Sequence, residues 1–518
     1  MATLPTVVWI GNAAAVLCGA HGDVTAQARS AHCSRQAAYG HADLVLDAVE
    51  QARQPGPDRH TLLRQVADLH SRVKDLRCQD ANRVDLGPDR LRGFAATAAA
   101  MGLSLNQTQE LLAVLLPPHR APDRSVLGRW VQQAATQAGR LLAVLDAHTR
   151  PAADTLCLDE IFFHGRPVLV GVEPHSFAVL LCARADDRTA ATWQHALQPF
   201  TGLRQVVHDA GSGLCAGVAA FDAQRQQQGQ APLWDGLDLF HTEQEAQRLL
   251  GRIWRGVEKL WHHAEGLDAR VGAGKARGRD TRGLQAQTRC AWQRAFAAFA
   301  RYEHWEGVWR RGRAALEVFR PDGTLSDRAW AEQELAAVCQ QLRAGYWKKL
   351  RAYLLDGRLL TFLDRLHARL AQAEPREGLR RELVELVRLE RTARHGEVGA
   401  EARAAVQRVV CARIAGDWAA GYARVAEALS GVVRASSAVE CVNGILRMHQ
   451  GRHRNLSQGL LDLKRLYWNT RVFRSGKRRH QRPYELLGLR LPTWDFGELL
   501  HRDPAQLAQE LSTGKAAA

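Results

Sequence analysis

The hydrophobic pattern divides the chain into a helical part, a β part and a second helical part. Apolar residues recur at helical spacing from residue 23 to about 150, form short alternating runs between 151 and 241, and then return to helical spacing. The opening stretch MATLPTVVWIGNAAAVLCGA is predicted to be a strand or coil before the first helix. It has no basic n-region and is too interrupted to span a bilayer, so we expect neither a signal peptide nor a membrane partner.

Residues 23–50 carry the pattern of a helix-turn-helix. A short helix over Val24–Ala31 meets a break at His32 and Cys33, and Ser34 is placed to cap a second helix. The first turns of that helix, where a recognition helix meets base edges and phosphates, carry three candidate DNA-binding residues: Arg35, Gln36 and Tyr39. A plain helical hairpin is the alternative.

The following helix carries apolar residues at alternating spacings of four and three. These residues are Leu62, Val66, Leu69, Val73 and Leu76. The spacing is that of a coiled-coil seam, but it lasts for only about two heptads. We therefore favour packing within the chain over dimerisation for this helix.

Residues 91–147 carry a second candidate helix-turn-helix. Two helices surround the turn Gly102–Ser104, and a third helix begins near Ser125. Arg129 and Trp130 lie on that third helix, and Arg129 is a candidate DNA contact. Two tandem helical modules predict a bipartite DNA site.

The periodicity becomes that of strands after Pro151. A hairpin is predicted at His164 and Gly165, and helices alternate with strands from there. The expected order is β-β-β-α-β-α-β, over residues 154–163, 166–173, 176–185, 188–200, 203–213, 214–228 and 234–241. Long amphipathic helices follow to the end of the chain.

The net charge of the chain indicates a kind of binding partner. Among 518 residues, 70 Lys and Arg outnumber 54 Asp and Glu, for a net charge of +16. Excess positive charge favours a polyanion, and nucleic acid is the commonest one. The alternative is a general basic bias, because Arg far outnumbers Lys. The ten cysteines include no CxxC pair, which argues against a zinc ribbon or a disulfide framework and fits a reduced, cytoplasmic chain.

Two acids interrupt the apolar run of the first strand. Asp159 shares a face with Cys157 and Ile161, where an unpaired charge is costly, whereas Glu160 faces the other side and is not expected to be a ligand. Asp209 follows the fourth strand next to Gly211. Because the first and fourth strands can be neighbours, we expect Asp159 and Asp209 to meet. The alternative is that Asp209 is a simple turn residue.

A third carboxylate is predicted far downstream. On a helix in residues 435–459, Glu440 shares one face with Asn443 and Arg447. Three hard oxygen ligands suit two Mg²⁺ or Mn²⁺ ions. The alternative is a capping box, with Ser437 at the N-cap and Glu440 at the third helical position. Asp238 and His241, expected on the fifth strand, are auxiliary candidates.

The strand order and the motifs LDE, VVHDAGSG and SSAVECVNGILR resemble the DDE transposases of bacterial insertion sequences, over residues 150–475. The resemblance implies a ribonuclease-H-like core in which Asp159, Asp209 and Glu440 are the catalytic residues and metal ligands. It implies metal-dependent hydrolysis at transposon ends, then attack of the freed 3′-hydroxyl on target DNA. The 231 positions from Asp209 to Glu440 exceed what a compact core needs and indicate a helical insertion.

The expected fold is therefore multidomain, α plus α/β, with helix-turn-helix modules, a ribonuclease-H-like mixed sheet and an all-helical insertion before the last catalytic helix. The expected domains are a first helix-turn-helix module (1–55), a linker helix with the second module (56–150), the first part of the core (151–264), the insertion (265–430), the Glu440 helix with a basic segment (431–482) and a tail (483–518). Trp305 and Trp309 of the insertion are interpreted as packing residues, with base stacking as the alternative.

The segment after Glu440 is the most basic one. Between Cys441 and Arg482 there are eleven Lys and Arg but one acid, which predicts phosphate contacts. The candidates are Arg452, Arg454, Lys477, Arg478 and Arg479.

The expected partners are double-stranded DNA, as transposon ends and target, and further copies of the chain in a homodimer or higher oligomer. The expected location is the bacterial cytoplasm, at the nucleoid when DNA is bound. Two alternatives stay open: a catalytically silent DNA-binding protein derived from a transposase, and a ribonuclease-H-like nuclease without strand transfer.

Overall fold

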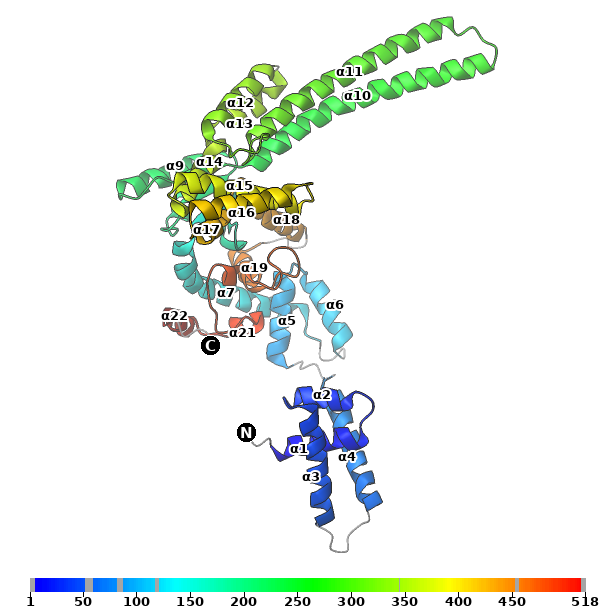
Figure 1. Ribbon diagram of the computed structural model, residues 1–518, viewed down its shortest axis with the longest axis vertical. Coiled ribbons are helices and arrows are strands. Elements are labelled where there is room, and N and C mark those ends of the chain that lie inside the picture. The colour runs from blue at the N-terminus through cyan, green and yellow to red at the C-terminus, as the bar shows by residue number, and fades with distance from the viewer. Residues whose placement is uncertain are drawn as a thin grey trace. The chain divides into compact units, whose positions relative to one another are not determined.

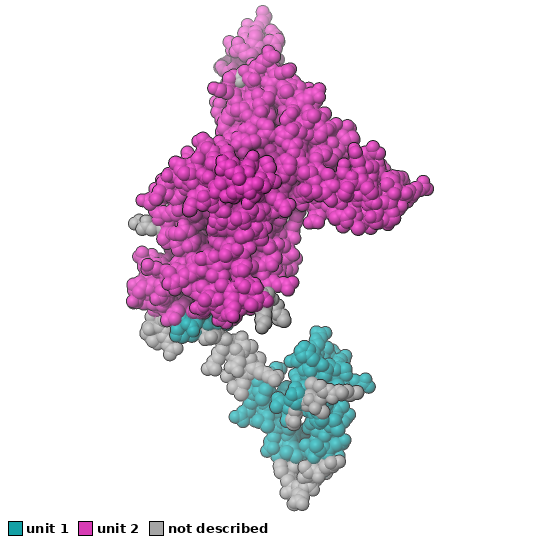
Figure 2. Space-filling view, turned by 90° about the vertical axis from the view of Figure 1, so that its left-hand side faces the viewer, with its two compact units in different colours: residues 1–90 teal, residues 91–518 magenta. Residues whose placement is uncertain are grey.

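The structure is a computed structural model that describes residues 5–51, 59–81, 87–116, 121–343, 345–451 and 456–513. The chain separates into two compact units, residues 1–90 and 91–518 (Figure 2). The described residues are mostly helical, with one five-stranded mixed sheet in the second unit. This agrees with a multidomain chain of α and α/β parts.

The first unit consists of helices α1 (Thr6–Cys18), α2 (Asp23–Ser30), α3 (Arg35–Gln51) and α4 (Arg59–Ala81). The prediction of a strand or coil at the N-terminus is wrong. Residues 13–15 of α1 are buried alanines, and α1 packs against α3, so tertiary burial outweighs the β-branched residues that favoured a strand. The break before α3 is confirmed: His32 has φ +49°, and Ser34 Oγ accepts a hydrogen bond from Ala37 N at 3.1 Å.

The seam on α4 is only partly covered. Leu62 is half-buried, whereas the side chains of Leu69 and Val73 are 58% and 46% exposed. The side chain of Leu76 lies outside the described residues. Packing within the unit therefore covers the first part of the seam and leaves its middle open.

Three helices precede the sheet: α5 (Pro88–Ala100), which belongs to the second unit from Leu91 onward, α6 (Leu105–Leu115) and α7 (Arg124–Ala152). The predicted turn between α5 and α6 is confirmed. Gly102 has φ +93°, and a Cβ at this position would lie 2.2 Å from the ring of His449. Ser104 then caps α6 through a capping box with Gln107.

The sheet follows the predicted order of elements. Its parts are β1 (Thr155–Phe163), β2 (Arg166–Glu173), β3 (Ala178–Arg184), α8 (Ala190–Leu197), β4 (Gln205–His208), α9 (Ser212–Gln227) and β5 (Trp234–Leu237). The strand order is β3-β2-β1-β4-β5, with β2 antiparallel to both β1 and β3, and with β4 and β5 parallel to β1. The first and fourth strands are neighbours, as the sequence predicted.

A long helical segment separates β5 from the last part of the fold. It comprises α10 (Leu239–Ala276), α11 (Arg282–Ala315), α12 (Arg328–Gln341), α13 (Lys348–Leu354), α14 (Thr361–Ala373), α15 (Glu377–Arg394), α16 (Ala400–Ile414) and α17 (Trp418–Ser430). Helices α10 and α11 form a long hairpin (Figure 1). Trp309 is buried and Trp305 packs in the same cluster, which agrees with packing roles. Among the described helices, none is long and apolar enough to cross a membrane.

The chain then returns to the sheet. Helix α18 (Ser437–Gln450) lies against β1 and β2, and α19 (Gln458–Thr470) lies against β3 and α7. The segment expected to be a tail forms the short helices α20 (Pro483–Leu486), α21 (Phe496–Leu500) and α22 (Pro504–Ser512). The last two pack against α7 and extend the main core.

Candidate active site

The pairing of β1 with β4 creates an acidic cluster at the point where these two inner strands cease to be paired. The two parallel strands are paired only as far as Leu158 and His208, so Asp159 and Asp209 both follow the last paired residues. Oxygen atoms of Asp159, Glu160 and Asp209 lie within 4.8 Å of one another. The structure therefore brings Asp159 and Asp209 together, as the sequence predicted.

Glu160 joins this cluster, against the prediction that it faces away. Beyond Leu158, β1 has no β4 neighbour, so side chains from both faces can meet around the open strand edge. Arg188 holds one oxygen, with its NH1 2.7 Å from Oε1 of Glu160. The other oxygen, Oε2, is buried and has no hydrogen-bond partner among the described residues.

Asp159 is a strongly perturbed acid. Asp159 is 8% exposed, and this burial raises the pKa of its carboxyl to about 7. The backbone N of Glu160 donates a hydrogen bond to Asp159 at 2.8 Å, which lowers the pKa but does not offset the effect of burial. The negative charges of Glu440 and Asp209 raise that pKa further. Nδ2 of Asn443 donates a hydrogen bond to Oδ2 of Asp159 at 2.5 Å, so α18 is joined directly to β1.

Asp209 is both a turn residue and a member of the cluster. Its Oδ1 accepts a hydrogen bond from Gly211 N at 3.0 Å. This bond forms the turn expected under the alternative that Asp209 is a simple turn residue. The buried ring of His208 donates from Nδ1 to the backbone oxygen of Asp209 and from Nε2 to Asp235, at 2.5 and 2.7 Å. Burial lowers the pKa of His208, but the hydrogen bond and charge of Asp235, with the contacts to Cys215 and to the backbone of Asp209, together outweigh it and raise the pKa to about 10. A charged His208 thus fixes the backbone of Asp209.

The capping-box interpretation of Glu440 is wrong. The N-cap of α18 is Ser436 rather than Ser437, and no side chain caps this helix. Glu440 instead faces two basic side chains: its Oε1 lies 3.7 Å from Nε2 of His241, and its Oε2 lies 3.4 Å from NH1 of Arg447. Glu440 is outside the 4.8 Å cluster but close enough to raise the pKa of Asp159.

Asp238 and His241 lie at the start of α10, not on the fifth strand as predicted, because β5 ends at Leu237. Asp238 caps α10 by accepting from Phe240 N at 2.8 Å. It also accepts from Ser436 N at 2.9 Å and from Ser436 Oγ at 2.5 Å, so it joins the starts of α10 and α18. Its hydrogen bond with Nδ1 of His241 raises the pKa of His241.

The acidic cluster fits a divalent cation. Three carboxylates offer hard oxygen ligands, and the buried, unpaired Oε2 of Glu160 is an acceptor without a donor among the described residues. Burial, followed by the negative charges of the neighbouring carboxylates, raises the pKa of Asp159, and a bound cation would favour its charged form. The residues that could hold an ion are therefore Asp159, Glu160 and Asp209, and Glu440 lies outside this 4.8 Å cluster.

The basic candidates have mixed environments. Arg35, Gln36, Tyr39 and Arg129 are exposed, whereas Arg452 and Arg454 lie outside the described residues. Lys477 and Arg479 are exposed, but Arg478 is half-buried and donates to the backbone oxygens of Pro174 and His175. That β2–β3 turn adjoins the start of β1, at the opposite end of the sheet from Asp209. Two further cations of the run, Lys464 and Arg465, are buried and thus unavailable to phosphates.

Sequence patterns missed four residues that build the site: Glu160, Arg188, His208 and Ser436. Strand alternation excluded Glu160 as a ligand, whereas His208 and Ser436 lie inside the motifs VVHDAGSG and SSAVECVNGILR but no role was predicted for them. Arg188 had no sequence signal, because a loop arginine is common and only the fold brings it to Glu160.

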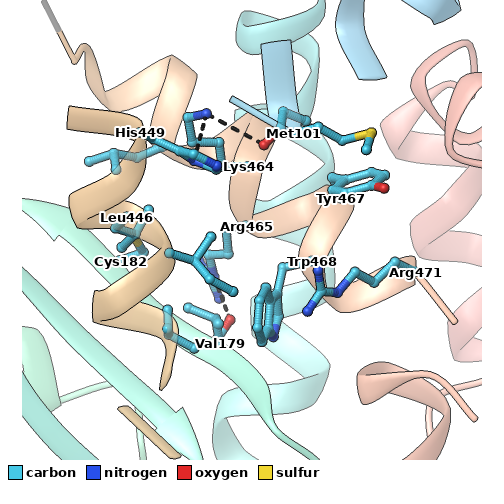
Figure 3. A pocket seen from close by; sticks show the side chains of 14 residues that line it. Met101, Val179, Cys182, Leu446, His449, Lys464, Arg465, Tyr467, Trp468 and Arg471 are labelled. Carbon is cyan, nitrogen blue, oxygen red and sulfur yellow. Dashed lines mark hydrogen bonds between the residues drawn. The ribbon is translucent and has the colours of Figure 1, made fainter. Parts of the chain in front are cut away.

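A small cavity of about 140 Å³ lies beside α18 (Figure 3). Apolar side chains of α18 and α19 line most of it, and Lys464 crosses one side. Nζ of Lys464 donates to the backbone oxygen of Ala99 at 2.8 Å and lies 3.1 Å from Nδ1 of His449. The buried side chain of Lys464 therefore joins the C-terminal ends of α5 and α18.

Comparison of the chain with protein-family models and with curated proteins found no match.

Proposed function

We propose that this protein is a DNA transposase of the DDE class with a ribonuclease-H-like core. One observation carries the proposal: the paired strands β1 and β4 bring the carboxylates of Asp159 and Asp209 together, and α18 is joined to that point through Asn443. Glu440 lies one helical turn before Asn443 and influences Asp159.

The sheet supports the fold part of the proposal. Three antiparallel strands followed by two strands parallel to the first, in the order β3-β2-β1-β4-β5, is the arrangement expected of such a core. The helical segment α10–α17 between β5 and α18 supports the proposed insertion. The exposed residues of α3 and α7, Arg35, Gln36, Tyr39 and Arg129, support helix-turn-helix roles for the helices that carry them.

In this proposal the carboxylates of Asp159, Asp209 and Glu440 would hold two Mg²⁺ or Mn²⁺ ions, and Glu160 would be a further ligand. When bound, such ions activate the attacking oxygen and stabilise the leaving oxygen in phosphoryl transfer. Asn443 orients the carboxyl of Asp159, and the His208 ring fixes the backbone of Asp209. Asp238 positions His241 and the start of the Glu440 helix.

The proposed substrate is double-stranded DNA, first the transposon ends and then the target. Bringing two ends together requires a dimer or a higher assembly. The proposed place of action is the cytoplasm, at the nucleoid.

The test is strand transfer in vitro with Mg²⁺ and DNA carrying the ends of the element. Asp159→Asn, Asp209→Asn and Glu440→Gln should each abolish joined products while DNA binding is retained. The matched control is Glu401→Gln, which neutralises an exposed acid on α16 and should keep full activity.

Two results would overturn the proposal in different ways. Cleavage without joining would identify a nuclease on the same core. Intact binding of the ends without cleavage by the wild type would identify a silent DNA-binding protein.

A further inference from the structure

The hairpin of α10 and α11 links the acidic site to a distant surface. Helix α10 has 38 residues and begins beside Asp238. At a rise of about 1.5 Å per residue, the C-terminal end of this helix lies roughly 50 Å from His241. The hairpin projects from the rest of the second unit (Figure 1).

The end of this hairpin, residues 270–294, is strongly basic, and we name it the arm tip. It contains seven exposed cations and one acid, Asp280. The cations are Arg270, Lys275, Arg277, Arg279, Arg282, Arg289 and Arg294. Within the described part of the chain, only Arg282 has an acid within 4 Å, Asp280 at 3.9 Å, and both side chains are more than 70% exposed. Exposed pairs of this kind contribute little, so the charge of the arm tip is essentially uncompensated.

Helix stability does not account for this charge. Cations are favourable at the C-terminal end of a helix, which explains Lys275 in the last turn of α10. Arg282, however, is the first residue of α11, and the first turn of that helix contains no acid. A cation at a helix N-terminus opposes the helix dipole. The stability of α11 therefore does not explain the placement of Arg282.

The turn that presents these arginines is well defined. The amide of Arg279 donates to the backbone oxygen of Gly274 at 3.0 Å, and Gly278 adopts φ +65°. A Cβ on Gly274 would lie 2.7 Å from Cγ2 of Thr281, so only glycine lets the two helices close here. Arg277, Arg279 and Arg282 are thus held on one short loop, which reduces the entropy lost on binding.

The chemistry of the arm tip favours DNA over a second copy of the chain. Seven like charges repel another copy of the same surface, whereas they match a row of phosphates. Phe296 is 56% exposed at the edge of the arm tip, but it stacks on Trp292 with ring centroids 5.7 Å apart and belongs to the hairpin's own packing. The aromatic side chains therefore serve the hairpin and leave the cations for a partner.

We propose that the arm tip binds the phosphates of duplex DNA at a distance from the acidic site. An arm of roughly 50 Å corresponds to roughly 15 base pairs of duplex. The inference rests on the proposed function in one respect: the acidic site and the arm tip are proposed to bind the same DNA. The contact is independent of base sequence, because it is made to phosphates.

The test uses the full chain and a 40-base-pair duplex of random sequence, with affinity measured from 50 to 300 mM salt. Arg277→Gln/Arg279→Gln/Arg282→Gln should weaken binding at least tenfold at low salt. It should also reduce the slope of log affinity against log salt by about 2 to 3, because each lost phosphate contact removes about 0.9. The matched control, Arg403→Gln/Arg408→Gln/Arg413→Gln on α16, removes the same charge from exposed positions and should change the slope by less than 1.

Equal losses in the two triple variants would show a general charge effect and overturn the proposal. An unchanged slope in the arm-tip variant, with a change in sedimentation instead, would assign the arm tip to self-association and also overturn it. A melting temperature equal to that of the wild type checks that the hairpin still folds. Failure of the proposed function would give a different result. In that case the wild type, like Asp159→Asn, would not cleave DNA, but the arm-tip variant would still bind DNA more weakly than the wild type.

Discussion

Asn443 donates a hydrogen bond to Asp159 across 284 positions of the chain, at 2.5 Å, and both residues are buried. This bond joins the helix of Glu440 to the strand of Asp159 at the acidic cluster, and Nε2 of Gln450 joins the same two elements by donating to the backbone oxygen of Phe162 at 2.7 Å. The bond from Asn443 places an uncharged donor on an acid whose pKa is already raised by burial.

Asn443→Leu should separate positioning from folding. The substitution keeps the branched shape of the side chain but leaves Oδ2 of Asp159 without its donor, so we expect a loss of about 1 to 3 kcal/mol in the free energy of unfolding. The affinity for Mn²⁺, measured by calorimetry, should fall by about tenfold because the carboxyl is no longer oriented. Unchanged Mn²⁺ affinity together with reduced stability would show that Asn443 serves packing alone.

Ser436→Ala should weaken the junction between α10 and α18. The hydroxyl of Ser436 is buried and donates to Asp238, whose other contacts would remain. We expect a loss of about 1 to 2 kcal/mol in urea unfolding. Ser437→Ala is the matched control, and it should change stability by less than about 0.5 kcal/mol because Ser437 is exposed and does not cap the helix. A larger effect at Ser437 than at Ser436 would restore the capping-box interpretation.

Divalent cations should stabilise the protein through the acidic cluster. An ion that binds only the folded state raises stability by about 2.7 kcal/mol when its concentration is a hundred times the Kd. The rise in melting temperature with 10 mM MgCl₂ should disappear in Asp209→Asn and after chelation with EDTA. Glu160→Gln should reduce the rise if Oε2 is a ligand, and an unchanged rise would return Glu160 to a structural pairing with Arg188.

Lys464 should make stability depend on pH. Burial lowers the pKa of Lys464 to about 7 from an ordinary value of 10.5. Between pH 7 and 8.5 the unfolded chain holds this proton and the folded chain has largely released it, so unfolding takes up a proton and stability rises with pH. The rise is at most about 1.4 kcal/mol per pH unit. Lys464→Met should lose it, giving a difference of about 1 to 2 kcal/mol between the wild-type and variant pH responses in urea unfolding. Parallel responses of the two proteins would contradict the lowered pKa.

The exposed middle of the α4 seam should contribute to self-association. Leu69→Ser/Val73→Ser replaces two exposed apolar side chains, so the melting temperature should stay within about 2 °C of the wild type. The mass in analytical ultracentrifugation should shift toward the monomer, because a heptad seam is completed by a second helix. An unchanged mass would leave the seam as an ordinary exposed helix face.

The sequence by itself determined the order of the elements from β1 to β5 and placed Asp159 and Asp209 on two strands that could be neighbours. The elements depend on local signals, since alternating strands, glycine turns and helix caps act over a few residues. The break before α3 and the turn at Gly102 were predictable for the same reason. The position of Glu440 on a helix also followed from spacing, although its distance from the cluster did not.

Only the tertiary structure decided which other residues complete the site. Alternation along β1 assigns a face to Glu160, but it does not say where β4 stops and the strand edge opens. Asp238 and Ser436 are 198 positions apart, and no local pattern records their bond. The burial of Lys464, which looked like one more cation in a basic run, likewise depends on α5 and α18 closing around it. Short-range periodicity sets the elements, whereas long-range packing sets which side chains share a site.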